Sequence, residues 1–303
     1  MSDIVWHTTL LLKRLKGNMY SPARATDMMW GRIILWSLPS LLLSVTISEH
    51  NTLVIKTIAG PDAAPTFNRL NTQGTSDLKG GNTLMLSRLL SSSAHACVDE
   101  LLGFESDYDG VSRRDKGLFG RVQGHLGTVT SYEPGAITFH LVIWLLNAPT
   151  LNEMRNGLKS KGFRERVARY IASVCQGEPD SDMGEVERML VDELQVHKCS
   201  PYCSGNRCKL HSVRATSKSI TVDEDGSWQI VRTGTRYDTY NPSITCTMQL
   251  QQCLHVFTNG SGTKHEVGLL SKFVGAPRNP NVDISALLST TLSDKCHDAL
   301  MPG

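Results

Sequence analysis

The densest group of potential metal ligands lies in Val196–His211, with the sequence VHKCSPYCSGNRCKLH. Thiolate and imidazole groups suit tetrahedral zinc, and a short loop lets several of them reach one ion. The cysteines are spaced C-x3-C-x4-C rather than as C-x2-C pairs, so a solvated loop with free thiols is the alternative. We predict a zinc-knuckle-like insertion over residues 196–211. Its expected ligands are His197, Cys199, Cys203 and Cys208, with His211 in reserve.

A second candidate is His140, within the apolar run Ile137–Leu145 (ITFHLVIWL). Alternation along a strand places Thr138, His140 and Trp144 on the same face. A lone histidine in such a strand is more often a packed core residue than a metal ligand. On these residues alone, packing is the favoured interpretation.

A third candidate is Arg232–Pro242 (RTGTRYDTYNP). Its tyrosines and arginines could stack on bases and hold phosphates, although a turn-rich loop is the favoured alternative. The sequence contains no G-x-x-x-x-G-K-[ST], so no nucleoside triphosphate site is expected. It also lacks G-x-S-x-G and H-E-x-x-H, which excludes the common hydrolase motifs.

The overall composition is that of an ordinary globular protein. The chain has 31 Lys+Arg and 29 Asp+Glu, a net charge of 31 − 29 = +2, with 40% hydrophobic and 20% charged residues. This balance gives no global nucleic-acid signal, so any such site must be local. The eight cysteines are not arranged as in a small secreted domain, which favours a reducing, intracellular compartment. No secretory signal opens the chain, and Ile33–Ile47 is too short and interrupted to cross a bilayer, so no membrane association is expected.

Hydrophobic patterning predicts an α+β fold, in which an antiparallel sheet carries the His140 strand and helices flank it. Residues 1–30 are expected to be poorly ordered, 31–258 to form the main domain, and 259–303 to be an irregular tail. The helices are expected at Trp30–Leu38, Thr83–Leu102, Thr150–Val174 and Gly184–Leu194. The strands are expected at Leu41–Ile47, Thr128–Tyr132 and Ala136–Leu146, with a hairpin over Ser219–Val231.

The order of several sequence blocks resembles one family, the Helitron helicase-like N-terminal domain. This is the Rep-type HUH endonuclease part of eukaryotic, especially fungal, rolling-circle transposon proteins. The blocks that carry the resemblance are Leu38–Gly60, Gly117–Val129, Ala136–Leu145, Val196–Cys208 and Trp228–Pro242. The resemblance implies a Rep-like fold, a single-stranded DNA substrate and a nuclear location.

The resemblance also implies a reaction. In this family, two histidines that flank one apolar residue hold a divalent ion, Mg²⁺ or Mn²⁺, which polarises a scissile phosphate. A downstream tyrosine attacks and forms a covalent phosphotyrosine intermediate. Matching Trp144 to the family's tryptophan places His140 on the second histidine and Thr138 on the first. Alignment on Lys272 places His265 and Leu269 where the tyrosines belong, and no tyrosine follows Tyr240.

The favoured hypothesis is therefore a degenerate Helitron-like Rep domain without nicking activity or a helicase motor, with residual single-stranded DNA binding. The first alternative is an active metal-dependent nuclease that uses His140, another ligand such as Glu133, and a water nucleophile. The second is a zinc-stabilised interaction module. A solvated helix face is the competing interpretation of the arginines. The candidate DNA-binding residues are Arg164, Arg166, Arg169, Arg207, Lys209 and Tyr240.

Overall fold

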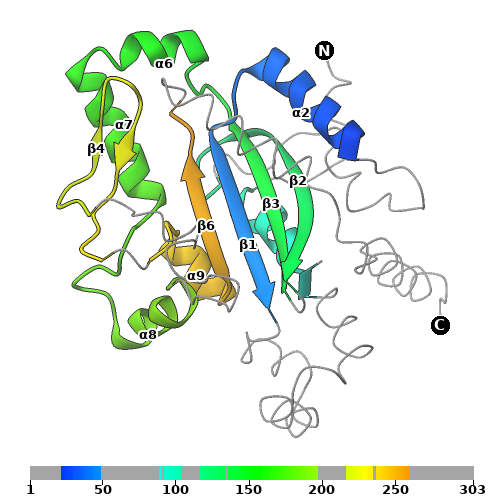
Figure 1. The fold of residues 1–303 in the computed structure, drawn as a ribbon, viewed down its shortest axis with the longest axis vertical. Helices are drawn as coiled ribbons and strands as arrows, with labels where there is room; N and C mark the ends of the chain where they lie inside the picture. The colour runs from blue at the N-terminus through cyan, green and yellow to red at the C-terminus, as the bar shows by residue number, and fades with distance from the viewer. Residues whose placement is uncertain are drawn as a thin grey trace, which may run out of the picture. The chain divides into compact units, whose positions relative to one another are not determined.

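Four strands form the main sheet of the protein, in the order β2-β3-β1-β6 (Figure 1). The structure is a computed structural model that describes residues 22–48, 89–90, 92–103, 117–133, 136–196, 216–234 and 237–258. The strands of the main sheet are β1 (Leu41–Ser48), β2 (Val122–Glu133), β3 (Ala136–Leu145) and β6 (Gln251–Val256). The expected mixed fold, an antiparallel sheet with flanking helices, is confirmed at this level.

The helices are α2 (Pro22–Trp36), α6 (Leu151–Gly157), α7 (Lys161–Val174), α8 (Glu185–Leu194) and α9 (Pro242–Met248). A π-helical segment, η3 (Ala96–Leu101), ends the helical stretch that was expected up to Leu102. The short strands β4 (Thr221–Val222) and β5 (Trp228–Gln229) pair antiparallel, as expected for the hairpin over Ser219–Val231.

The sequences of β1 and β3 explain their inner positions in the sheet. β1 (LLLSVTIS) and β3 (AITFHLVIWL) are almost continuously apolar, whereas an edge strand needs only one buried face. Leu41, Leu43 and Ile143 have no exposed surface. Strands with this pattern are stable where both faces of the sheet are covered.

Residue contacts divide the chain into two compact units, and the division passes through β1 and β3. The first unit comprises residues 1–29, 46–140 and 273–303, and the second comprises residues 30–45 and 141–272. Among the described residues of the first unit, β2, the start of β3 and η3 bury Leu126, Phe139 and Cys97. The amide of Leu118 donates to the carbonyl of Leu101, which ties the start of this strand pair to the end of η3.

In the second unit, Trp144 at the end of β3 anchors the core. It is 1% exposed, and its indole Nε1 donates to the Ser37 carbonyl at 3.1 Å. The ring of Trp36 meets it edge-on at 5.9 Å. The Arg32 guanidinium lies 5.6 Å from the Trp36 ring centroid and 5.8 Å from that of Trp144. These contacts fix the end of α2 to β3 through aromatic and cation–π interactions.

The structure differs from expectation in α2, α6, α7, α9 and β6. The helix expected over Thr150–Val174 is two helices, α6 and α7, because the junction is rich in weak helix formers and Gly157 packs against the Phe163 ring. A Cβ at Gly157 would lie 2.8 Å from that ring. α2 begins at Pro22 and ends at Trp36, whereas the helix was expected over Trp30–Leu38. α9 and β6 were not expected, because buried polar residues interrupt their hydrophobic pattern.

Candidate functional site

The two residues at the positions of the family's histidine pair lie on β3, in the first unit. Thr138 Oγ1 is 2.9 Å from Thr46 Oγ1 of β1, so the two hydroxyls share a hydrogen bond. Both threonines are only partly exposed. One hydroxyl thus donates to the other inside the sheet, and Thr138 is committed to a contact between neighbouring strands.

His140 is a core residue in this structure. It is 2% exposed, and its strand neighbours Phe139 and Leu141 are 2% and 4% exposed. Burial disfavours the imidazolium, which lowers the pKa of His140 to about 4. The imidazole is therefore neutral at physiological pH, where it packs within the sheet.

The described residues do not provide a ligand set around this imidazole. A divalent ion needs several donor groups at one point, and the described part of the chain contains no group of three or more His, Cys, Asp and Glu side chains that could hold one. Glu133, the alternative ligand, is the last residue of β2, and its side chain lies outside the description. The residues present at Thr138 and His140 thus fit packing better than metal binding.

Most of the other predicted site residues lie outside the described residues. These include the proposed zinc ligands and the two residues at the tyrosine positions, for which the sequence predictions stand as made. They are His197, Cys199, Cys203, Arg207, Cys208, Lys209, His211, His265 and Leu269.

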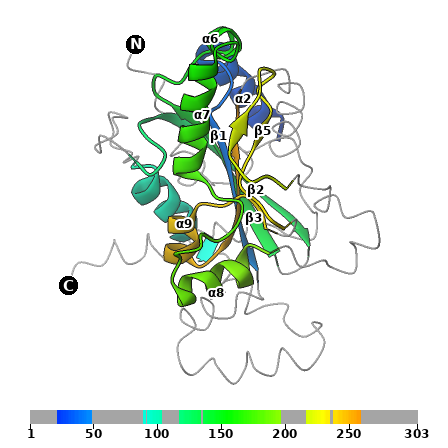
Figure 2. The same ribbon diagram turned by 90° about the vertical axis from the view of Figure 1, so that its left-hand side faces the viewer.

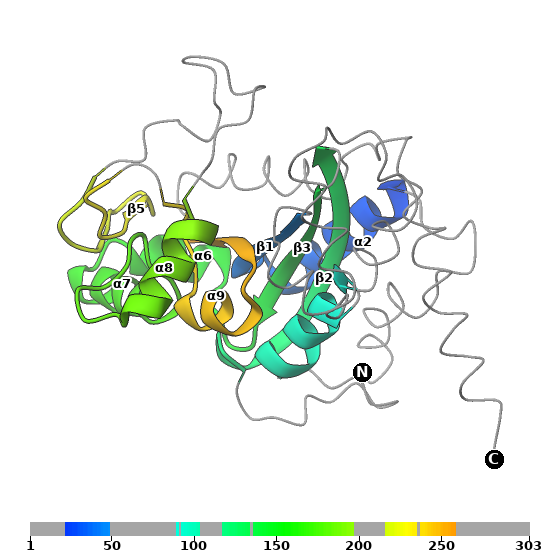
Figure 3. The same ribbon diagram turned by 90° about the horizontal axis from the view of Figure 1, so that it is seen from below.

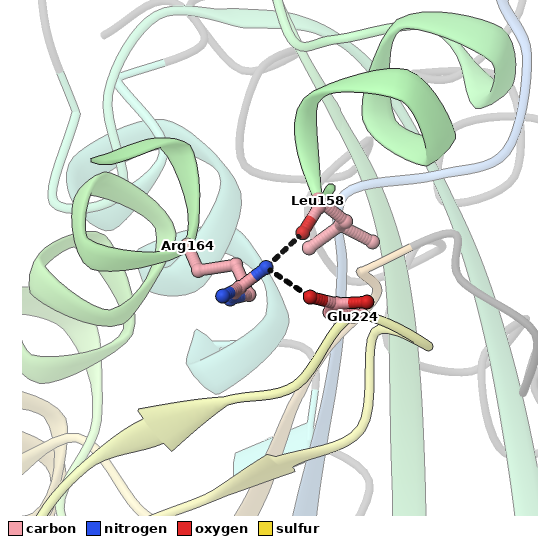
Figure 4. A network of polar contacts seen from close by, with 3 residues as sticks. All are labelled: Leu158, Arg164 and Glu224. Carbon is pink, nitrogen blue, oxygen red and sulfur yellow. Dashed lines mark hydrogen bonds and ion pairs between the residues drawn. The ribbon is translucent and has the colours of Figure 1, made fainter. Parts of the chain in front are cut away.

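Of the α7 arginines, Arg164 has a structural role. Its Nη1 donates to the Leu158 carbonyl at 2.6 Å and to Glu224 Oε1 at 3.2 Å (Figure 4). Its side chain is 21% exposed. Arg164 therefore joins the end of α6 to the turn of the β4–β5 hairpin, which leaves little of its charge for an external phosphate.

Arg166 and Arg169 are different, because both are exposed. The Arg166 guanidinium lies 5.3 Å from the centroid of the Phe163 ring, which holds it against the helix surface. Residues 151–174 contain six Lys+Arg and two Glu, a net charge of 6 − 2 = +4. The surface of α6 and α7 is thus locally basic in a chain that is close to neutral.

The aromatic residues of the Arg232–Pro242 segment are engaged within the second unit. Tyr240 has no exposed surface, and its hydroxyl donates to Gln176 Oε1 at 3.2 Å, so no face of its ring is open to a base. The buried Arg232 donates from Nε to the Gly177 carbonyl and from Nη2 to Thr239 Oγ1. The Tyr237 hydroxyl donates to Asp192 Oδ1. Burial and the nearby carboxylate raise the pKa of Tyr237 to about 12.

Sequence analysis missed a buried polar network that organises this region. Asn241 caps α9 by accepting from the Ile244 amide, and its Nδ2 donates to the Val174 carbonyl at 2.7 Å. Gln252 of β6 donates to the Asn241 carbonyl and to Thr245 Oγ1. Gln195 Nε2 also donates to Thr245 Oγ1. The motif Asn241-Pro242, with a cap residue before proline, was the one sequence signal of this helix start.

Comparison with known proteins adds no relative. No family model and no curated protein matches the chain. Within the described residues, none of the helices has the length and apolar character needed to span a bilayer.

Proposed function

We propose that this protein is a degenerate Helitron-like Rep domain that binds single-stranded DNA without nicking it. The observation that carries the proposal is the state of Thr138 and His140. Both lie on an inner strand of an antiparallel sheet, one bonded to Thr46 and the other 2% exposed. The proposal explains why a strand with the family's pattern carries packing residues at the ion-binding positions.

The loss of nicking follows from the chemistry that these positions no longer supply. A threonine hydroxyl is a weaker ligand for a divalent cation than imidazole. The sequence after Tyr240 also contains no tyrosine that could attack a phosphate. Without a nucleophile, the covalent step of the family's reaction cannot take place in this chain.

DNA binding is proposed for the exposed cations of α6 and α7. Arg155, Lys159, Lys161, Arg166 and Arg169 are all exposed. Lys161 lies 3.9 Å from Glu165, an exposed pair that does little to neutralise the surface. Phosphate contacts from such cations release counterions, so this binding is expected to weaken as salt rises. A nuclear location belongs to the same proposal.

A nicking assay tests the catalytic part of the proposal. The protein is incubated with labelled single-stranded DNA and Mn²⁺, alongside His140→Ala. We expect no cleavage and no covalent protein–DNA adduct from either protein. Cleavage by the unaltered chain that is lost in His140→Ala would refute the proposal and support the metal-dependent nuclease.

Fluorescence anisotropy with a labelled oligonucleotide tests the binding part. We expect Arg166→Ala/Arg169→Ala to weaken binding and to reduce the slope of log K against log salt by about 1.4, because each phosphate contact contributes about 0.7 on a single strand. Arg121→Ala, at an exposed arginine just before β2, is the matched control and is expected to leave both quantities unchanged. An unchanged slope in the double variant would exclude this surface.

A further inference from the structure

A strongly acidic segment follows the basic one directly. Residues 176–194, which comprise the loop after α7 and all of α8, contain seven Asp+Glu and one Arg, a net charge of 1 − 7 = −6. The chain as a whole carries +2. Such a concentration of negative charge attracts a positively charged partner and orients its approach.

Three of the seven acidic residues of this segment, Glu178, Asp180 and Asp192, line a pocket in the second unit. The pocket measures about 690 Å³, within the range of small-ligand and side-chain binding sites. Its apolar lining includes Ala172, Ile220 and Ile230, and its polar lining includes Glu178 and Asp192. An aliphatic stem that ends in a cation would match this combination of surfaces.

The carboxylates that line the pocket are positioned by hydrogen bonds, not neutralised by cations. Glu178 Oε2 accepts from the backbone amide and hydroxyl of Thr233. Asp180 Oδ2 accepts from Gln176, and Asp192 Oδ1 accepts from the Tyr237 hydroxyl. None of the three forms an ion pair within the described part of the chain. The three carboxylates therefore line the pocket in fixed positions.

The single arginine of the segment does not cancel this charge. Arg188 Nη2 donates to the Asp180 carbonyl at 2.8 Å and to the Ser181 carbonyl at 3.3 Å. The guanidinium therefore closes the loop onto α8 through backbone oxygens. It forms no ion pair with a carboxylate among the described residues.

Apolar side chains extend the surface beyond the pocket. Val186 and Met189 of α8 are 72% and 65% exposed, and Val231 on the pocket lining is 37% exposed. Met189 follows the pocket residue Arg188 along α8, so it lies on the adjoining side of the helix, about 100° away. α8 also packs against α9 (Figures 2 and 3). We call Val186, Met189, Val231 and the three pocket carboxylates the α8 surface.

We propose that the α8 surface docks a basic segment of a partner protein in which lysine or arginine alternates with apolar residues. The charge of residues 176–194 selects a cationic partner, and the exposed valines and methionine select one that also carries apolar side chains. The pocket shares α7 with the proposed DNA-binding cations, since Ala172 lines it one turn after Arg169. The inference does not depend on the Rep-like assignment.

The test is fluorescence anisotropy of the full chain with a labelled 12-residue peptide in which lysines alternate with leucine and alanine. No DNA is present, so the outcome is independent of DNA binding. We expect Glu178→Gln/Asp192→Asn, which keeps the hydrogen-bond acceptors but removes two charges, to weaken binding about tenfold. We expect Val186→Ser/Met189→Ser to weaken it several-fold, since both side chains lie at the surface.

Two controls make the result decisive. Ile34→Ser on α2 removes an equally exposed apolar residue, 82% exposed, and is expected to leave binding unchanged. A peptide with glutamate in place of lysine is expected not to bind. If spermidine displaces the peptide and the valine–methionine variant binds as tightly as the unaltered chain, the surface attracts any polycation and the proposal is overturned. It is also overturned if the lysine peptide fails to bind. A third contrary result is equal binding of the peptide by all variants in the anisotropy assay when circular dichroism shows that each variant is folded.

Discussion

Burial of a neutral His140 makes the stability of this fold depend on pH in a defined direction. The imidazole is 2% exposed, and burial lowers its pKa to about 4, against about 6.5 for an exposed histidine. As pH falls through 6.5, the unfolded chain binds a proton at this residue and the native state does not. Stability from this residue is therefore fully present above pH 6.5 and is lost progressively between pH 6.5 and 4.

The size of the effect follows from the two pKa values. Linkage between them gives a loss of about 2 kcal/mol at pH 5 relative to neutral pH, rising to about 3 kcal/mol below pH 4. A loss of this size is a substantial part of the free energy of unfolding of a typical domain, about 5–15 kcal/mol. It should be visible in an ordinary denaturant titration.

The assay compares urea unfolding of the unaltered chain and His140→Leu at pH 7.5 and pH 5. The substitution His140→Leu also changes the free energy of unfolding by an amount that does not depend on pH. This amount cancels when each protein is compared with itself at the two pH values. We expect the unaltered chain to lose about 2 kcal/mol more than the variant between these pH values. The substitution His95→Gln, at a partly exposed histidine of the helical stretch before η3, is the matched control for loss of an imidazole. Equal losses in the unaltered chain and His140→Leu would refute the assignment of His140 to the core.

Four further outcomes are expected. Thr138→His should show no Mn²⁺ binding by electron paramagnetic resonance. It should also lower the free energy of unfolding by about 1–3 kcal/mol, because it breaks the Thr46 hydrogen bond and overfills the strand face. Stoichiometric Mn²⁺ binding without loss of stability would contradict this. Asn241→Ala should cost about 2–3 kcal/mol in urea unfolding, since it removes the α9 cap and a buried donor. Arg164→Met should cost about 1–2 kcal/mol by loss of its carbonyl contact, with Arg169→Met as the exposed control near zero. Purified protein should contain about one zinc per chain by mass spectrometry, and chelation should remove it; a metal-free chain would exclude the zinc prediction.

The main strands of the sheet could be predicted because their sequences carry unambiguous patterns. The run ITFHLVIWL is apolar on both faces, and it forms an inner strand. LLLSVTIS is similar, and it forms the neighbouring strand β1. The turn residues of DEDG between polar β-prone segments likewise predicted the β4–β5 hairpin, whose register is Thr221 with Gln229.

Elements held together by buried polar groups could not be predicted in this way. The alternation in β6 places Gln252 in the core beside Leu254, so the strand lacks a clear apolar face in the sequence. The amide nitrogen of Gln252 is tolerated there because Asn241 and Thr245 accept its hydrogen bonds. Those partners lie 7–11 residues earlier in the chain, and no periodic pattern identifies them. For the same reason, the sequence predicted Tyr240 to be an exposed residue that stacks on bases, although the fold buries it.

Under the proposed Rep-like assignment, the Thr46–Thr138 pair accounts for a stable sheet without a bound ion. A metal-binding position on an inner strand is costly without its ion, because polar groups buried there need partners. Two threonines on adjacent strands meet part of this need, since one hydroxyl donates and the other accepts. A neutral histidine two residues along the strand adds no charge to the core at physiological pH. Under the proposed assignment, replacement of the first histidine would remove the need for the ion and keep the sheet stable at the same time.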